Sequence, residues 1–294
     1  SDLHGADRAV SVTIVQTADL HFGSAADIRQ VEALERLVPD LRPDAIVVAG
    51  DLSLRARHGE FQRARALVMR LGETAPVLVI PGNHDVRWWW RPLLPFGTRA
   101  CYGKYVAYFG DNLTPTIEVP GAVFASVLTA HGVAWGSLTF RPRDIAVKGH
   151  LPKGEIERAT KVFRGAAPGV LRVLVAHHNV LRGAISQRMG LARWKQAQRR
   201  IMASGADLVL CAHDHQEGAD TLPNGTIVAT ASTLSTRPRG GRPSSFNVVI
   251  ADEDSVQITF FRWEAERGRF RASDTHAFTR PRRALVAEPA VATG

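Results

Sequence analysis

Short apolar runs that each lead into a potential metal ligand are the feature of this sequence that most constrains its fold. The runs cover residues 12–15, 45–48, 77–80, 170–176 and 208–211. Short runs rich in β-branched residues are typical of strands buried on both faces, and helical patterns separate the first three runs. This order predicts βαβ units with parallel strands, whose carboxyl ends meet at one edge of a sheet. Ligands from distant parts of the chain should therefore converge there.

The spacing of apolar residues also predicts the remaining elements. We expect helices over 25–38, 60–71, 153–163 and 191–204, and further strands over 122–128, 133–138, 226–231, 246–251 and 255–261. A chain of 294 residues that is 45% hydrophobic can bury the core of one sizeable domain with two packed sheets. The predicted fold class is α/β, with a single domain over 1–279. The segment 280–294 is rich in Pro and Ala without periodicity, which predicts a disordered tail.

A strong positive charge limits the choice of partner. The formal net charge is +9 and the pI is about 10.3, values that suit nucleic acid, anionic lipid head groups or a phosphorylated substrate. No apolar run approaches the roughly 20 residues that span a bilayer, and the first residues lack the apolar segment of a signal peptide. The sequence therefore indicates a cytoplasmic protein. Cys101 and Cys211 are too few for a disulfide framework, and Cys211 should be a small buried residue.

The residue types at the strand ends indicate the chemistry. Asp, Asn and His offer oxygen and imidazole ligands, which suit Mn, Fe, Zn or Co better than a thiolate site would. Six or more such groups exceed what one tetrahedral ion needs, so we expect two ions with a carboxylate bridging them. Two ions about 3.5 to 4 Å apart suit displacement at phosphorus, because one activates water and both hold phosphoryl oxygens. The pattern therefore predicts phosphoester hydrolysis.

Short motifs in a fixed order carry a family resemblance. They are Asp19-Leu20-His21, Gly50-Asp51, Gly82-Asn83-His84-Asp85, His177 and His213-Asp214-His215. In this order and with these gaps, the chain resembles the calcineurin-like metallophosphoesterases from about residue 12 to residue 215. The segment 51–83 is most similar to the bacterial cyclic-nucleotide and glycerophosphodiester phosphodiesterase branch. The resemblance implies a four-layer αββα sandwich of two mixed sheets, with a metal site at the carboxyl rim of the strands.

The resemblance also implies a role for each motif residue. One ion would be held by Asp19, His21 and His215. The other would be held by Asn83, His177 and His213, and Asp51 would bridge the two. His84 would contact the phosphoryl group or protonate the leaving oxygen, with Asp85 helping to orient it, since an imidazole that binds a metal cannot also act as a general acid.

Two positions depart from the family pattern. Ala212 precedes His213 where the family usually has Gly, so we expect slight crowding and no loss of metal. Asn179 follows the His177-His178 pair where this branch usually has Pro, which leaves a backbone N–H and an amide near the site. The second departure bears on substrate preference more than on catalysis.

Candidate substrate contacts lie outside the motifs. Trp88 begins a run of three tryptophans just after Asp85, and these could form an aromatic wall for a nucleobase, an aryl ester or an acyl chain, or could pack the loop onto the body. His58 is a further candidate because it follows the Asp51 turn closely enough to approach a substrate. Arg141 is another, since an arginine there could bind a phosphate group. His178, beside a predicted ligand, is more often a packed or second-shell histidine.

The predicted function is hydrolysis of a small phosphodiester, such as a cyclic nucleotide or glycerophosphodiester, by a bimetallic enzyme. The tryptophans and the positive charge leave open a lipid-linked phosphoester or pyrophosphate hydrolase, which would contact membranes peripherally. A basic nucleic-acid-binding module with a structural metal site is a third reading, and steep salt dependence of DNA binding without ester hydrolysis would favour it.

Overall fold

Two β-sheets form the centre of the protein in the computed structural model, which describes residues 11–86, 101–131 and 147–281. The first sheet contains β1 (Val12–Thr17), β2 (Ala45–Ala49), β3 (Val77–Ile80), β10 (Ser245–Ala251), β11 (Ser255–Glu264) and β12 (Arg269–Thr279). The second contains β4 (Thr116–Val119), β5 (Ala122–Ser126), β6 (Leu171–His178), β7 (Leu208–Ala212), β8 (Gly218–Thr221) and β9 (Ile227–Thr230). The strand orders are β12-β11-β10-β1-β2-β3 and β4-β5-β6-β7-β9-β8, and both sheets mix parallel and antiparallel neighbours.

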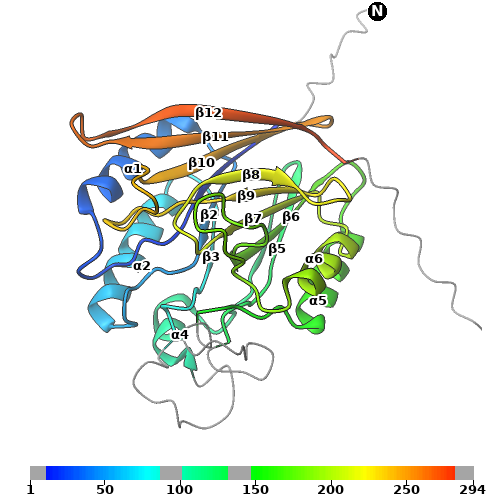
Figure 1. Ribbon diagram of the computed structural model, residues 1–294, viewed down its shortest axis with the longest axis horizontal. Coiled ribbons are helices and arrows are strands. Elements are labelled where there is room, and N and C mark those ends of the chain that lie inside the picture. Colours follow the sequence, from blue (N-terminus) through cyan, green and yellow to red (C-terminus); the bar gives the residue numbers. More distant parts are fainter. Residues whose placement is uncertain (1–10, 87–100, 132–146, 282–294) are drawn as a thin grey trace, which may run out of the picture.

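Helices cover the outer faces of both sheets, as Figure 1 shows. They are α1 (Ile28–Leu41) and α2 (His58–Gly72) on the first sheet and α5 (Lys153–Gly165) and α6 (Trp194–Ala203) on the second, while α4 (Gly103–Phe109) packs against α2. Three separate apolar clusters fill the spaces between the layers. One lies between α1, α2 and the first sheet, one between the sheets, and one between the second sheet and α5 and α6. The four-layer αββα sandwich expected from the sequence is therefore confirmed.

The two sheets meet at the carboxyl ends of their parallel strands. Strands β1, β2 and β3 run parallel in the first sheet, and β5, β6, β7 and β9 run parallel in the second. Gln16 in β1 donates from its side chain to the Cys211 carbonyl of β7 at 2.8 Å. His177 in β6 donates to the Ala49 carbonyl of β2 at 2.8 Å. Because these bonds cross between sheets, the two rims form one continuous edge.

The structure contains elements that apolar spacing did not predict. These are α4, β4, β8 and β12. Strand β12 exposes most of its side chains, and β4 and β8 are half exposed, so none of them shows a clean buried face. The predicted helices and the other predicted strands are present with ends shifted by a few residues. The predicted strand over 133–138 lies outside the described residues.

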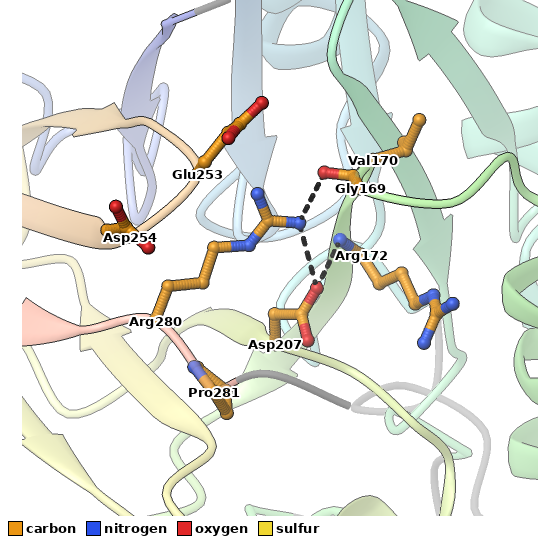
Figure 2. Close-up of a pocket in the computed structure, with 8 residues that line it drawn as sticks. All are labelled: Gly169, Val170, Arg172, Asp207, Glu253, Asp254, Arg280 and Pro281. Atoms are coloured by element: carbon orange, nitrogen blue, oxygen red, sulfur yellow. Dashed lines mark hydrogen bonds and ion pairs between the residues drawn. The ribbon is translucent and has the colours of Figure 1, made fainter. Parts of the chain in front are cut away.

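The opposite edge of the sandwich is fastened by Arg280, as Figure 2 shows. Its guanidinium donates to the Gly169 carbonyl at 2.8 Å and pairs with the Asp207 carboxylate at 3.4 Å. The Arg172 amide also donates to Asp207, at 3.0 Å. Gly169 and Asp207 lie just before β6 and β7, so this hollow of about 420 Å³ is at the amino ends of the strands. It is therefore separate from the edge that carries the predicted ligands.

Arg280 is well buried, with 9% of its surface exposed, so the chain is still anchored where the predicted tail begins. Most of the segment 280–294 lies outside the described residues, and the tail remains a prediction. Among the described helices, none combines the length and the apolar character that a membrane crossing needs.

Candidate metal centre

The structure brings all the predicted metal ligands together at the shared carboxyl rim. They follow β1 (Asp19, His21), β2 (Asp51), β3 (Asn83) and β7 (His213, His215), or lie at the end of β6 (His177). Apart from His177, which lies within the last residues of β6, each ligand lies in the loop just after its strand, where the backbone turns. Groups of these side chains have ligand atoms within 4.8 Å of one another.

Several of these residues adopt a left-handed backbone conformation that non-glycine residues usually avoid. The φ angles are 51° at Asp19, 46° at His21, 52° at Asp51, 76° at His213 and 52° at His215. Such conformations each cost on the order of 1–3 kcal/mol and persist where the surroundings enforce them, most often at functional sites. The strain indicates that the fold positions these side chains at the expense of local backbone energy.

The first ligand cluster contains Asp19, His21 and His215. The Nε2 atoms of His21 and His215 are 2.9 Å apart, and the Asp19 Oδ1 lies 3.6 Å from His215 Nε2 and 3.8 Å from His21 Nε2. Ligands that share one ion at about 2.1 Å lie roughly 3 to 4 Å from each other. The spacing of the three atoms therefore fits a single transition-metal ion.

The second cluster is built around His177. Its Nε2 lies 3.1 Å from Asn83 Oδ1 and 3.4 Å from Asp51 Oδ1. The ring of His213 lies edge-on to the His177 ring, with centroids 5.2 Å apart. The other oxygen of Asp51, Oδ2, faces the first cluster at 3.9 Å from His21 Nε2. One carboxylate thus reaches both clusters, as a bridging ligand must.

Hydrogen bonds to backbone carbonyls fix the orientation of two of the ligand histidines. His177 donates from Nδ1 to the Ala49 carbonyl at 2.8 Å, and His215 donates from Nδ1 to the Arg237 carbonyl at 2.9 Å. The Nε2 atom of each ring is then the nitrogen that could offer its electron pair to a cation in the cluster. Carbonyl acceptors of this kind commonly set the tautomer of metal-binding histidines.

His178 also lies beside the cluster, with atoms close enough to His177 and His213 to complete a ligand group. Both of its ring nitrogens are already in hydrogen bonds, however. Nδ1 lies 2.8 Å from the Thr129 hydroxyl, and Nε2 donates to the Val147 carbonyl at 3.1 Å. A nitrogen that donates to a carbonyl cannot bind a metal at the same time. The His178 ring therefore packs beside the ligand histidines His177 and His213.

Buried polar atoms in the cluster lack partners within the described protein. Asp19 Oδ1, His21 Nδ1 and His213 Nδ1 are buried and form no hydrogen bond there. Buried polar atoms are nearly always satisfied in folded proteins, so such orphans call for an explanation. A cation in each cluster would satisfy Asp19 Oδ1 and His213 Nδ1. The oxygen and nitrogen donor set fits the Mn, Fe, Zn or Co ions expected from the sequence.

The electrostatics of the cluster also suit cations. Burial lowers the pKa of His21 to about 3 and that of His215 to about 4, so both rings are neutral and can act as ligands at pH 7. Burial raises the pKa of Asp19 well above its usual value. Burial likewise opposes ionisation of Asp51, but neighbouring His177 and His84 hold its pKa well below the usual range.

His177 shows the opposite shift, because its pKa is raised to about 9. Burial lowers this pKa, but the Asp51 carboxylate and its hydrogen bond to the ring raise it by more. Asp51 and His177 would therefore share a proton when no cation is bound. A cation bound there would replace that proton, which is the usual coupling between metal binding and proton release.

His84 lies at the mouth of the cluster with its ring edge-on to His21, at a centroid distance of 4.7 Å. Its Nδ1 donates to the Leu54 carbonyl at 2.9 Å, and its backbone N–H donates to Asp51 Oδ1 at 2.8 Å. The Leu54 carbonyl thus helps to orient the ring, and the expected part of Asp85 in orienting it stays a prediction.

The Asp85 carboxylate forms hydrogen bonds with the two loops that carry Asp51 and Asn83. The carboxylate accepts hydrogen bonds from the backbone N–H groups of Leu52, Ser53 and Gly82 and from the Ser53 hydroxyl, at 2.8 to 3.1 Å. It is fully buried, and burial raises its pKa to about 6. It therefore acts as a structural anchor of the two loops.

Other residues that shape the site were not singled out from the sequence. Thr233 donates from its hydroxyl to the Asp19 carbonyl at 2.5 Å, and Asn247 donates to Gln16 Oε1 at 2.9 Å. Gln16 in turn reaches β7, so these buried side chains link the two halves of the cluster. No sequence motif marks such contacts, since they depend on which strands become neighbours.

The two departures from the family pattern have clear structural positions. Ala212 ends β7 with its side chain fully buried in the cluster between the sheets, where the methyl group is accommodated. The amide of Asn179 donates to the carbonyls of Leu181 at 2.8 Å and Arg188 at 3.2 Å. Asn179 therefore secures the loop that follows β6.

The predicted substrate contacts are mostly untested by the structure. Trp88 to Trp90 and Arg141 lie outside the described residues. His58 is exposed at the first turn of α2, and its Nδ1 lies 3.1 Å from the Tyr108 hydroxyl. The loop after β9 does border the site, because the Arg239 N–H donates to the His215 carbonyl at 3.1 Å.

Curated relatives match short parts of the chain. The glycerophosphodiester phosphodiesterase GpdQ of Enterobacter lignolyticus is 40% identical over 67 residues, which is 23% of this chain and 22% of the relative. A transmembrane protein with a metallophosphoesterase domain from Danio rerio is 27% identical over 109 residues, covering 34% of this chain and 24% of the relative. The matches thus span under a quarter of the length of these relatives.

Solved structures show the same fold at low sequence identity. A purple acid phosphatase from yellow lupin aligns over 95% of this chain and 56% of its own, with a TM-score of 0.66 and 13% identity. A dimetal phosphatase from Danio rerio aligns over 92% of this chain and 99% of its own, with a TM-score of 0.61 and 14% identity. The family model described as calcineurin-like phosphoesterase matches residues 12–217, from β1 to just past the last ligand. The chain therefore belongs to the calcineurin-like phosphoesterase family.

Proposed function

We propose that this chain is a metal-dependent phosphodiesterase that uses two ions to hydrolyse a small diester. The position of Asp51 carries this proposal, because its two oxygens face two separate ligand clusters. The buried atoms without partners, Asp19 Oδ1 and His213 Nδ1, lie one in each cluster and add independent support. Membership of a phosphoesterase family is consistent with this chemistry.

The residues divide between the two ions as their distances suggest. Asp19, His21 and His215 would hold the first ion, and Asn83, His177 and His213 the second, with Asp51 shared. Two ions in such a site supply an activated water and hold the phosphoryl oxygens during in-line displacement. The chain contributes the spacing of the ligands and a mostly buried environment that strengthens their electrostatic effect.

His84 is placed to act on the reacting group. Its Nδ1 donates to the Leu54 carbonyl, so a proton for the leaving oxygen would come from Nε2. The charged imidazole would donate a proton from Nε2 to the leaving oxygen, and the neutral ring would lack that proton. His84 can therefore serve as the general acid without leaving its position beside His21.

The diester preference rests on similarity to glycerophosphodiester phosphodiesterase GpdQ and on the motif spacing between Asp51 and Asn83. A panel of substrates tests it with the purified protein loaded with Mn, Fe, Zn or Co. We expect higher kcat/KM for bis(p-nitrophenyl) phosphate, a diester, than for p-nitrophenyl phosphate, a monoester with the same leaving group. Cyclic nucleotides and glycerophosphodiesters then refine the choice. Faster hydrolysis of the monoester would contradict the diester assignment.

A further inference from the structure

A hollow of about 500 Å³ lies beside the candidate metal centre. Its walls come from residues 23–24, which follow the first ligand loop, and from the segment that leads from β2 into α2. Arg55, Arg57 and Arg63 line it together with Glu60. The hollow therefore borders the loops that carry the metal ligands, and three of its four charged residues are arginines.

The hollow is close to the ligands in space as well as in sequence. Gly23 follows His21 by two residues, so their Cα atoms are within about 7 Å of each other. Leu54, which also lines the hollow, accepts the hydrogen bond from His84 Nδ1 at 2.9 Å. The Leu54 N–H donates to the Phe22 carbonyl at 3.0 Å and joins the two walls. A substrate held by the ions and His84 would thus extend into this hollow.

The charges that line the hollow are not neutralised within the described protein. Arg55, Arg57 and Arg63 are exposed, and none forms an ion pair with a described residue. Glu60 is the acidic residue of the hollow, and its Oε2 already accepts from the backbone N–H groups of Arg55 at 2.8 Å and Arg57 at 3.1 Å. Three arginines and one glutamate therefore line the hollow, and the positive charges outnumber the negative one.

The segment that carries the arginines is held rigidly. Ala56, between Arg55 and Arg57, has a φ of 49°, which is unusual for alanine. Its N–H donates to the Ser53 hydroxyl at 3.1 Å, and its carbonyl accepts from Lys104 Nζ at 3.0 Å. A strained backbone conformation that hydrogen bonds hold in place is typical of functional segments. A segment that is already ordered also loses less entropy when it binds a ligand.

We propose that this hollow is a subsite for a second phosphate group of the substrate, one that is separate from the phosphate being hydrolysed. The inference rests on the proposed function, since it assumes that a diester binds at the metal cluster. Arginine suits this role because its planar guanidinium donates two parallel hydrogen bonds to phosphate oxygens. The favoured substrate is then a phosphodiester that carries a further phosphate on one arm.

Two thymidine compounds with the same leaving group test the subsite directly. One is thymidine 5′-(p-nitrophenyl phosphate), and the other carries an additional 3′-phosphate. The metal-loaded full chain should hydrolyse both, with a KM on the order of tenfold lower for the 3′-phosphorylated compound, the scale of a charge-assisted hydrogen bond at an accessible site. The kcat values should be similar, because the added phosphate does not touch the reacting group.

Variants locate the effect in the hollow. Arg57→Ala and Arg63→Ala should each remove most of the KM difference between the two compounds and leave hydrolysis of the simpler one unchanged. Arg65→Ala is the matched control, because Arg65 is exposed on the same helix and does not line the hollow. All three are surface changes, and thermal melting checks that each variant is folded.

The possible outcomes separate this inference from the proposed function. Equal KM values for the two compounds in the unmodified protein would overturn the subsite and leave the phosphodiesterase assignment intact. A preference that survives in Arg57→Ala and Arg63→Ala, or that Arg65→Ala removes equally, would show a general charge effect and also overturn it. Hydrolysis of neither compound would contradict the proposed function, and the subsite would fall with it.

Discussion

Replacement of Gly82 by alanine should disable the metal centre through one added methyl group. A Cβ at this position would lie 2.1 Å from Asp51 Oδ1 and 2.3 Å from the Asp51 backbone nitrogen. Ordinary van der Waals contact begins at 3.4 Å, so the bridging carboxylate must move by more than 1 Å. The clash involves backbone as well as side chain, so a change of rotamer cannot relieve it.

A displacement of about 1 Å at a catalytic group costs on the order of 10²-fold in rate. We therefore expect Gly82→Ala to lower kcat/KM for bis(p-nitrophenyl) phosphate by at least about that factor, and to reduce metal content measured by elemental analysis. Gly154→Ala in α5 is the control, since a Cβ there meets nothing within 4 Å. Unchanged activity and metal content in Gly82→Ala would refute the placement of Asp51 between two ions.

Three further predictions follow from the same geometry. His84→Ala should retain both ions but lose on the order of 10² to 10⁴ in rate, with a smaller loss for p-nitrophenolate than for a poor leaving group; equal losses would mean that His84 binds phosphate without donating a proton. His178→Ala should lower the melting temperature and keep two ions per chain, because both ring nitrogens bond to protein groups, and loss of one ion would show that His178 is a ligand. In the chelated protein, the folded-state pKa values of His21 and His215 are about 3 and 4, whereas a histidine in an unfolded chain has a pKa of roughly 6.5. As the pH falls, the unfolded state therefore takes up protons first. The free energy of unfolding should then decrease from pH 6.5 towards pH 4. Asp19 and Asp85, whose pKa values burial raises, oppose this trend in part, and a melting temperature that rises as the pH falls from 6.5 to 4 would contradict the prediction.

The position of the ligands could be predicted because their motifs lie at strand ends. Asp19, Asp51 and Asn83 follow apolar runs, and parallel strands bring such ends to one edge. Their backbone conformation could not be predicted. The left-handed φ of Asp51, for example, is a conformation that the local preference of a non-glycine residue disfavours.

Elements without a buried face were missed for a related reason. Strand β12 is held by its long pairing with β11, and most of its side chains are exposed. Helix α4 has 7 residues, too few for a clear helical period. Such elements depend on neighbours supplied by the rest of the fold.

Carboxylates that bind backbone groups are equally hidden in the sequence. Asp85 lies within a metal-site motif, yet its oxygens accept from loop N–H groups. Glu60 similarly holds the turn that carries Arg55 and Arg57. Residue type and spacing are the same for a ligand, an orienting group and a loop anchor, so only the folded geometry separates these roles.

The number of ions held by the bridging carboxylate tests the central claim most directly. We predict two transition-metal ions per chain in the purified, metal-loaded protein, measured by elemental analysis alongside hydrolysis of bis(p-nitrophenyl) phosphate. Asp51→Asn, which keeps the size of the side chain and removes its charge, should lower the ion count and abolish turnover while the circular dichroism spectrum stays unchanged. Two ions and near-normal turnover in Asp51→Asn would contradict the two-ion centre.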